Sequence, residues 1–478
     1  MSNVQPLSSA SDDQSTVQAL FEAQKAAQIK DPYPSLSLRL DRIDRMIDMV
    51  VRNESILIDA VMSDFENRSA MVTRSTDLMP TLDNLKHVRK HLKGWMRPEK
   101  RKSLFPLGLI GGKSKVEHVP LGVVGNISPW NFPIQLSLAP MADIFGAGNR
   151  IMLKPSELSP ESSRVMAEII AANFDKTELA VALGGPDVAS EFAALPFDHL
   201  LFTGSTNIAR LVSQSAAPNL VPLTLELGGK NPTIVSASAD IELTAEKLIW
   251  AKTLNGGQIC LCPDTVYVPE DKIEALVTAC KKAVKKLFPD IATDKDYTHI
   301  ITQRHADRLR AMSQEAVDTG ARVIPLHEGG CEGRRVLPAL VIDASAECKI
   351  SQEEVFGPLL AIKTYTQLPA VIEEINSQAK PLALYYFGHN KSEIDKLTRE
   401  TSSGGMVIND LLGHILQEDL PFGGVGESGT GVYHGYDGFK NFSHAKAIYV
   451  QSKLDPFRIL RPPYNDTINK AIAGRIKR

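Results

Sequence analysis

The first hundred residues carry the hydrophobic pattern of helices. In the stretch LRLDRIDRMIDMVVRNESILIDAVMSDF, residues 38–65, apolar side chains recur every three or four positions between charged ones. This spacing places the apolar residues on one side of a helix, so the pattern predicts helices over residues 16–100. Residues 1–15 are polar and lack the pattern, and we expect no regular element there.

Beyond residue 105 the pattern changes to short β-rich runs that alternate with helical stretches. The runs GVVGNI, RIMLK, HLLFTG and PTIVS are separated by helical segments such as ESSRVMAEIIAANF. A second set, from about residue 230 to about residue 415, contains the runs VYVP, ARVI, ALVID and PLLAIKTY. Strands that alternate with helices are typical of parallel βαβ units. The sequence therefore predicts an α/β fold with a doubly wound sheet.

Size and composition indicate a globular protein with more than one domain. The chain has 478 residues, 43% of them hydrophobic and 23% charged. At roughly 100–200 residues per domain, two or three domains are expected. Lys and Arg number 53 against 56 Asp and Glu, which gives a net charge of −3. Without a basic excess we expect no nucleic-acid partner, and without a run of about 18 apolar residues we expect no membrane partner.

The cysteines and the N-terminus indicate a cytoplasmic protein. The five cysteines are an odd, sparse set: Cys260, Cys262, Cys280, Cys331 and Cys348. The N-terminal segment MSNVQPLSSASDDQSTVQAL has neither the basic region nor the apolar core of a secretory signal. We therefore expect free thiols in a reducing compartment, with at least one of them a candidate for reactivity.

Two patterns suggest sites that we do not expect. His87 and His91 lie four residues apart, but no Glu separates them and Lys and Arg surround them, so a solvated helix face is favoured over a metal site. The segment GVGESG, residues 424–429, matches the dinucleotide fingerprint, yet it follows no clear strand. A glycine-rich loop with a close backbone approach is the better interpretation, and no metal is expected anywhere in the chain.

Cys260 is the first candidate for chemistry. It ends the segment NGGQIC, in which glycines allow close backbone approach and offer amide N–H groups to a ligand. The residues alone leave two interpretations open: a presented nucleophilic thiol or a buried structural cysteine. Cys262, two residues later, is expected to point the other way and to pack.

Two further segments offer groups that could assist a nucleophile. In TLELGGK, Glu226 lies between leucines, a setting that raises the pKa of a carboxyl group and suits a general base. In PWNFP, the side-chain amide of Asn131 could donate to a developing oxyanion. A helix-capping Glu and a turn Asn remain the plainer interpretations of these two residues.

Two strand ends suggest a nucleotide site. In RIMLKPSELSP, Lys154 and Glu157 follow a strand and could converge on a ribose at the carboxyl edge of a sheet. In FTGSTNIAR, Gly204 and Ser205 form a turn between a strand and a helix, where unpaired N–H groups could meet a pyrophosphate.

Taken together, these segments carry a family resemblance. PWNFP, KPSE, FTGST, ELGGK, NGGQIC, EEVFGP and PFGGVGESG occur in the order seen in aldehyde dehydrogenases, and the chain resembles that superfamily from about residue 30 to about residue 450. The late segment GVYHGYDGFKNFSHAKAI resembles the class-3 branch, and within it the bacterial enzymes that act on coniferyl aldehyde.

The resemblance implies roles for the candidate residues. Cys260 is the expected nucleophile, Glu226 the base that activates the hydrolytic water, and Asn131 an oxyanion donor. The expected cofactor is NAD, with NADP as the alternative. Its implied contacts are Lys154, Glu157, Gly204 and Ser205, and, at the nicotinamide ribose, Glu354 and Phe356.

The resemblance also implies an aldehyde-dehydrogenase-like domain arrangement. A Rossmann-type NAD-binding domain is expected over residues 1–228, with an arm hairpin near 106–119 and a return segment near 416–432. A catalytic domain over 229–415, a β oligomerisation arm over 433–455 and a tail over 456–478 complete the expectation. By resemblance, the arm joins two subunits into a homodimer.

The expected reaction is NAD(P)-dependent oxidation of an aldehyde to its carboxylic acid through a Cys260 thiohemiacetal and thioester. An aromatic phenylpropenal such as coniferyl aldehyde is the expected substrate, and a medium- or long-chain fatty aldehyde is the second possibility. Three more distant possibilities are a CoA-acylating enzyme, a Cys–His hydrolase and a non-catalytic structural protein on the same fold. The glutamate at position 226 argues against the CoA-acylating enzyme, and no histidine motif supports the hydrolase.

Overall fold

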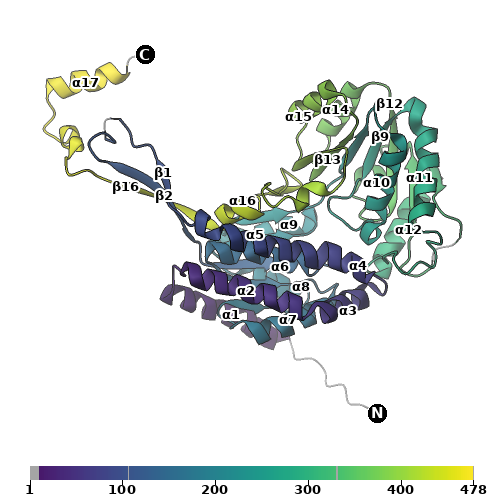
Figure 1. The fold of residues 1–478 in the computed structure, drawn as a ribbon, viewed down its shortest axis with the longest axis horizontal. Helices are drawn as coiled ribbons and strands as arrows, with labels where there is room; N and C mark the ends of the chain where they lie inside the picture. The colour runs from purple at the N-terminus through teal and green to yellow at the C-terminus, as the bar shows by residue number, and fades with distance from the viewer. Residues whose placement is uncertain (1–9, 106, 330–331, 477–478) are drawn as a thin grey trace, which may run out of the picture.

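Two large β-sheets, each covered by helices, make up the body of the protein, and a small third sheet projects from it (Figure 1). The computed structural model describes residues 10–105, 107–329 and 332–476. The N-terminal nine residues of the expected polar lead, and Cys331, lie outside this range. The helical pattern begins earlier than predicted, because helix α1 starts at Ala10 rather than near residue 16.

The six-stranded sheet is parallel except at one edge. Its strands run in the order β15–β7–β6–β3–β4–β5, and only β15 is antiparallel to its neighbour. The strand bounds are β3 Val123–Ile127, β4 Arg150–Lys154, β5 Leu179–Val181, β6 His199–Thr203, β7 Leu223–Glu226 and β15 Gly429–Thr430. Strands β3, β4 and β6 are buried along their whole length, as expected for a parallel sheet covered on both faces.

The seven-stranded sheet follows in the sequence. Its order is β10–β11–β12–β9–β8–β13–β14, with β10 alone antiparallel to its neighbour. The strand bounds are β8 Pro232–Val235, β9 Thr265–Pro269, β10 Arg322–Pro325, β11 Ala339–Ile342, β12 Leu359–Tyr365, β13 Ala383–Phe387 and β14 Gly405–Ile408. Every run that the sequence predicted as a strand forms one, while β5, β7, β13, β14 and β15 of the two large sheets were not predicted.

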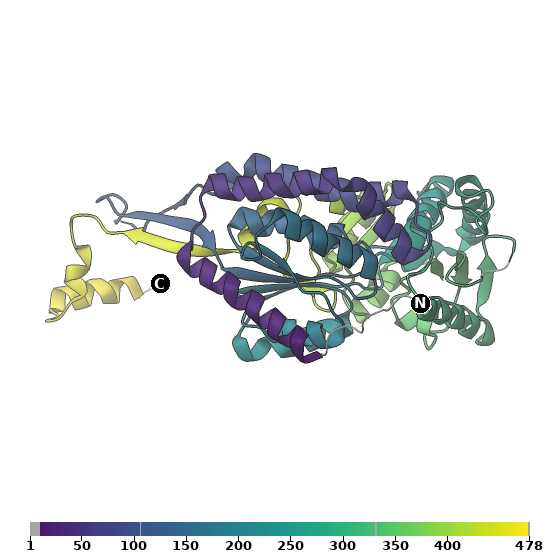
Figure 2. The same cartoon turned by 90° about the horizontal axis from the view of Figure 1, so that it is seen from below.

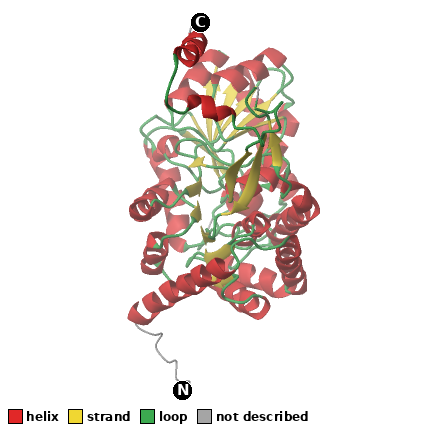
Figure 3. Ribbon diagram, turned by 90° about the vertical axis from the view of Figure 1, so that its left-hand side faces the viewer, coloured by secondary structure: helices red, strands yellow, loops and turns green. Residues whose placement is uncertain are grey.

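Helices pack on the faces of both sheets, as Figure 3 shows with helices in red and strands in yellow. Those around the six-stranded sheet are α1 Ala10–Lys30, α2 Leu36–Arg52, α3 Glu54–Phe65, α4 Ala70–Thr73, α5 Met79–Trp95, α6 Gln135–Ala147, α7 Pro160–Asn173, α8 Pro186–Ala194, α9 Thr206–Ala216 and α16 Gly435–Asn441. Those around the seven-stranded sheet are α10 Ile241–Thr253, α11 Ile273–Leu287, α12 Gln303–Asp318, α13 Lys349–Gln352, α14 Leu368–Ser377 and α15 Lys391–Glu400. Within the described ranges, no helix has both the length and the apolar character needed to cross a membrane.

The projecting sheet joins two distant parts of the chain. Strand β2, Lys113–Pro120, lies between β1, Glu99–Arg101, and β16, Ser443–Val450, with both pairs antiparallel. The hairpin is thus formed by β1 and β2, and β1 precedes the start expected near residue 106. The C-terminal helix α17, Asp466–Ile476, lies near the outer end of this sheet, separate from the body (Figure 2).

Candidate active site

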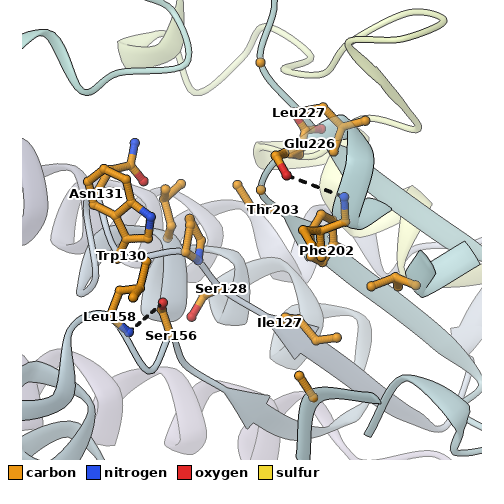
Figure 4. Close-up of a pocket in the computed structure, with 18 of the residues that line it drawn as sticks. Ile127, Ser128, Trp130, Asn131, Ser156, Leu158, Phe202, Thr203, Glu226 and Leu227 are labelled. Carbon is orange, nitrogen blue, oxygen red and sulfur yellow. Dashed lines mark hydrogen bonds between the residues drawn. The ribbon is translucent and has the colours of Figure 1, made fainter. Parts of the chain in front are cut away.

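A cleft of about 590 Å³ lies at the carboxyl ends of the strands of the six-stranded sheet. Parallel sheets bind ligands at this edge, where strand ends and helix starts converge. Figure 4 shows one wall with Ser128, Trp130 and Asn131, and across from it Phe202, Thr203 and Glu226. All nine site residues predicted from the sequence line this cleft: Asn131, Lys154, Glu157, Gly204, Ser205, Glu226, Cys260, Glu354 and Phe356.

Cys260 sits just after a tight turn whose backbone is left-handed. Asn255, Gly256 and Gly257 have φ angles of 50°, 60° and 75°. A Cβ on Gly257 would lie 2.3 Å from the carbonyl oxygen of Gly357, so this position requires glycine. The sequence correctly indicated a close backbone approach, but the partner is the loop that carries Glu354 and Phe356 rather than a ligand.

The pKa of the Cys260 thiol lies above its ordinary value. Burial raises its pKa to about 12, and the carboxyl groups of Glu354 and Glu226 add to the rise. Main-chain N–H groups of Leu261 and Cys260 act in the opposite direction but more weakly. Because the thiolate is the nucleophilic form, attack requires a nearby base to take the proton.

Glu226, which the sequence predicted as a base, lies buried in the same cleft. It ends strand β7, its side chain is 3% exposed, and neither carboxyl oxygen has a hydrogen-bond partner among the described residues. Burial raises the pKa of this carboxyl well above its usual value. The main-chain carbonyl of Glu226 also accepts a 3.0 Å hydrogen bond from the N–H of Gly204, which joins the two strand ends.

Asn131 is fixed in the loop between β3 and α6. Its side-chain Nδ2 donates to the carbonyl of Gln258 at 3.1 Å, two residues before Cys260. An amide nitrogen carries two N–H groups, so the second is left for an oxygen near the sulfur. Its own main-chain carbonyl accepts hydrogen bonds of 2.9 Å from Arg68 Nη1 and Asn255 Nδ2.

Glu354 and Phe356 lie on the loop that contacts the Cys260 turn. A Cβ on Gly228 would lie 2.2 Å from Glu354 Oε2, so the carboxyl group lies directly over the glycines of ELGGK. Burial raises the pKa of Glu354 to about 8, with Asp264 adding to the rise. Phe356 has a φ of 46°. Its ring packs edge to face on that of Trp130, with 5.5 Å between the ring centroids. Backbone strain of this kind gathers at functional sites.

The predicted ribose and phosphate contacts lie at the carboxyl ends of neighbouring strands. Lys154, 1% exposed, ends β4, and its Nζ lies 3.5 Å from Oε2 of Glu157. Gly204 follows β6, and Ser205 caps helix α9, with its Oγ accepting from the N–H of Ile208. An ammonium and a carboxylate suit the diol of a ribose, and the first N–H groups of a helix suit a pyrophosphate. This donor set fits a nicotinamide dinucleotide.

The local packing of GVGESG agrees with its favoured interpretation, whereas that of His87 and His91 differs from it. A Cβ on Gly424 would lie 2.0 Å from the carbonyl oxygen of Ser428, so GVGESG is a tight backbone loop. His87 and His91 are not simply solvated: their rings pack against each other and against Trp95. No group of three or more potential metal ligands occurs within the described part of the chain.

Sequence reasoning missed several residues at the site. Helix α12 contributes Arg304, His305 and Arg308 to the cleft, and no sequence signal marked them. Asn231, directly after ELGGK, donates from Nδ2 to the carbonyls of Cys260 at 2.7 Å and Cys262 at 3.0 Å. Its position beside a chosen motif was the available signal. Cys262 itself is buried, with its Sγ 3.5 Å from the carbonyl of Ala251, as expected for a packing residue.

Comparison with known proteins gives a consistent picture. A sequence profile of the aldehyde dehydrogenase family matches residues 5–448. Coniferyl aldehyde dehydrogenase of Pseudomonas sp. strain HR199 is 45% identical over 455 residues, which cover 94% of each chain. The dimeric NADP-preferring aldehyde dehydrogenase of Canis lupus familiaris is 33% identical over 88% of this chain and 91% of its own.

A solved structure extends the likeness to three dimensions. The substrate-bound state of Staphylococcus aureus AldH superposes with a TM-score of 0.90 at 34% sequence identity. The match covers 96% of this chain and 99% of that one.

Proposed function

The chain belongs to the aldehyde dehydrogenase family, and we propose that it oxidises an aromatic phenylpropenal, such as coniferyl aldehyde, to the carboxylic acid. Members of the family catalyse NAD(P)-dependent aldehyde oxidation, and this chain is such an enzyme. The observation that carries the site assignment is that Cys260, Glu226 and Asn131 line one cleft.

The proposed reaction begins at Cys260. Its thiol gives up a proton, for which the buried Glu226 is the acceptor, and the sulfur attacks the aldehyde carbon. The oxyanion of the resulting thiohemiacetal accepts hydrogen bonds from Asn131 Nδ2 and from the main-chain N–H of Cys260. A nicotinamide dinucleotide, held by Lys154, Glu157 and the Gly204–Ser205 turn, would supply the hydride acceptor, and loss of hydride from the thiohemiacetal would leave a thioester on Cys260. After Glu226 has passed the first proton to solvent, it takes a proton from water, and the resulting hydroxide adds to the thioester carbon. The C–S bond then breaks, the acid leaves, and the thiolate recovers a proton from Glu226.

Aromatic side chains close to the nucleophile support an aromatic substrate. Trp130 and Phe356 line the same cleft as Cys260, and their rings meet edge to face with centroids 5.5 Å apart. Flat rings in the wall of the cleft offer edge-to-face contacts to a phenyl group. The relative named coniferyl aldehyde dehydrogenase, 45% identical, supports the same substrate class.

A substrate panel tests this proposal. We expect kcat/KM for coniferyl aldehyde to exceed that for octanal and hexadecanal by at least about tenfold, or about 1.4 kcal/mol. Formation of the acid, measured by chromatography, avoids interference from the absorbance of the aldehyde. A higher kcat/KM for either aliphatic aldehyde would replace the aromatic assignment with the fatty-aldehyde one.

We further propose that the two large sheets correspond to an NAD-binding domain over residues 1–228 and a catalytic domain over 229–415. The division falls in ELGGK, between strands β7 and β8, where the chain passes from one sheet to the other. Protection of the six-stranded sheet from hydrogen exchange on addition of NAD would support the assignment. Protection confined to the seven-stranded sheet would reverse it.

The projecting sheet supports a homodimer. Strand β16 is an edge strand, and apolar side chains are exposed nearby on the arm: Leu104, Phe105, Leu109, Tyr449 and Val450. Exposed edges and apolar patches are covered in stable proteins. Sedimentation equilibrium is expected to give twice the chain mass, and a monomer at all concentrations would contradict this.

We propose that the protein resides in the cytoplasm, and the free thiols of the described cysteines support a reducing compartment. Cys260, Cys262, Cys280 and Cys348 are free. Fractionation of the native host, with the enzyme followed by antibody, is the direct test, and recovery from an oxidising compartment would contradict the assignment.

A further inference from the structure

A buried ion pair lies behind the loop that carries Asn131. Arg68, between α3 and α4, and Asp77, in a short π-helix over Arg74–Leu78, are both fully buried. Their side chains meet at 2.5 Å, between Arg68 Nη2 and Asp77 Oδ2. Neither residue lines the cleft, and neither was marked by the sequence.

The ion pair forms hydrogen bonds with the Asn131 loop at two points. Arg68 Nη1 donates to the main-chain carbonyl of Asn131 at 2.9 Å. Asp77 Oδ1 accepts from the N–H groups of Ile134 and Gln135 at 3.1 and 3.3 Å, where helix α6 begins. A carboxylate at a helix start satisfies N–H groups that have no partner within the helix. The loop is therefore held both at Asn131 and at its exit.

Further contacts hold the Arg68 guanidinium in one orientation. Its guanidinium lies 5.0 Å from the Phe65 ring and 5.2 Å from the Phe132 ring, and Nη2 also donates to Thr76 Oγ1 at 3.0 Å. A planar guanidinium fixed in this way presents its donors in set directions, which a flexible ammonium would not do. Breaking one partner of a fully buried pair leaves an uncompensated charge, so the arrangement is held firmly.

We propose that Arg68 and Asp77 are positioning residues of the oxyanion site, which hold the side-chain amide of Asn131 in place through the main chain of its loop. The proposal rests on the function proposed above, in which Asn131 donates to the substrate oxygen. Because a displacement of about 1 Å in a reacting group can cost about a hundredfold in rate, a device that fixes the loop acts directly on turnover.

A double-mutant cycle tests the proposal, with the single-turnover rate of nicotinamide reduction as the readout. Asn131→Ala is expected to lower this rate by about 10²–10³-fold. Arg68→Met is expected to lower it by about 10–100-fold, with the Kd for NAD changed less than about threefold. The double variant is expected to be no slower than Asn131→Ala by more than about threefold, because Arg68 acts through Asn131.

A matched control separates positioning from stability. The Arg42 side chain is as buried as that of Arg68, and its Nε lies 3.0 Å from Glu178 Oε1. Glu178 directly precedes β5, so this ion pair lies at the amino ends of the strands, whereas the cleft lies at their carboxyl ends. Arg42→Met is expected to lower Tm as Arg68→Met does while leaving the single-turnover rate within about twofold of wild type. If Arg68→Met does not fold, Asp77→Asn, which keeps the size and one acceptor oxygen, enters the same cycle.

The outcomes separate the two proposals. Full rates in Asn131→Ala overturn the oxyanion role and the positioning role with it. If Asn131→Ala lowers the single-turnover rate and the double variant loses the full product of the two single effects, the positioning role of Arg68 is overturned while the oxyanion role of Asn131 stands. An Arg68→Met rate that matches that of Arg42→Met also overturns it, because the effect then follows stability.

Discussion

The side-chain Nδ2 of Asn231 donates a 2.7 Å hydrogen bond to the main-chain carbonyl of Cys260. The same nitrogen reaches the carbonyl of Cys262 at 3.0 Å, and Asn231 Oδ1 accepts from the N–H of Ala383 at 2.8 Å. One buried amide thus joins the cysteine turn to the start of β8 and to β13. The sulfur is held on a rigid support, as a nucleophile that must meet both an aldehyde and a base requires.

The two neighbouring cysteines are predicted to differ sharply. Cys260→Ala should abolish aldehyde oxidation, because the attacking sulfur is lost, while NAD binding measured by fluorescence is retained. Cys262→Ala should keep most of the activity, with a stability loss of about 1 kcal/mol, since Cys262 packs away from the cleft. An inactive Cys262 variant beside an active Cys260 variant would reverse the assignment.

Glu226→Gln is predicted to separate the two halves of the reaction. Glutamine keeps the size but cannot accept the proton from water. The variant should form about one reduced nicotinamide per subunit, slowly at neutral pH because Cys260 has lost its proton acceptor, and then stall as a thioester. Intact-mass measurement should show one acyl adduct, which is absent when Cys260 is also replaced, and hydroxylamine should restart turnover.

The same variant reports on the first proton transfer. Because Glu226 also accepts the proton of Cys260 in the proposed reaction, the burst in Glu226→Gln should recover its rate as the pH rises, since burial holds the pKa of the thiol high. Steady turnover at the wild-type rate without an adduct would leave Glu226 as a structural carboxyl group.

Glu157 is predicted to set the cofactor preference. Its carboxylate lies 3.5 Å from Lys154 Nζ, at the expected ribose position, where it would repel a 2′-phosphate. Glu157→Gln should narrow the ratio of kcat/KM for NAD over NADP by one to two decades, about 1.4–2.8 kcal/mol. Glu161→Gln, on the exposed side of α7 and paired with Arg164, is the control and should leave the ratio unchanged. An unchanged ratio in both variants would remove Glu157 from the ribose site.

Glu418 is predicted to destabilise the fold at neutral pH. Burial raises its pKa from 4.5 to about 7, with Asp83 and Asp419 adding to the rise. Below pH 4.5 the group is neutral in both the folded and the unfolded state and has no effect. Between pH 4.5 and 7 the unfolded chain loses the proton first, so the free energy of unfolding falls as the pH rises.

Glu418→Gln removes this penalty. The variant should match the wild type at pH 4 and exceed it by about 1–3 kcal/mol at pH 8, which is measurable as a higher Tm. Asp419→Asn, whose side chain is 90% exposed, should change the stability by less than about 0.5 kcal/mol at either pH. A gain that is equal at pH 4 and pH 8 would show that packing, rather than ionisation, is responsible.

Features that depend on neighbours along the chain could be predicted from the order of the amino acids. The hydrophobic pattern predicted the early helices and most of the parallel strands. A helix buried on one side has apolar residues every three or four positions, and a fully buried strand is a short continuous apolar run. Strand β5 was not predicted, since Leu179–Val181 is too short to show a period. Short motifs marked Cys260, Glu226 and Asn131, because each group lies in a contiguous turn or strand end.

The groups that support and tune these residues became known only from the three-dimensional arrangement. Arg68 donates to the carbonyl of Asn131, and Gly257 packs against the carbonyl of Gly357. The two partners of each contact lie far apart in the sequence, so no local sequence pattern predicts the contact. The raised pKa of Cys260 likewise depends on burial and on carboxyl groups from two other segments. The hydrogen-bond partners of buried polar groups come from distant parts of the chain, and desolvation depends on every group packed nearby. Neither the partners nor the pKa shifts can therefore be predicted from the neighbouring residues in the sequence.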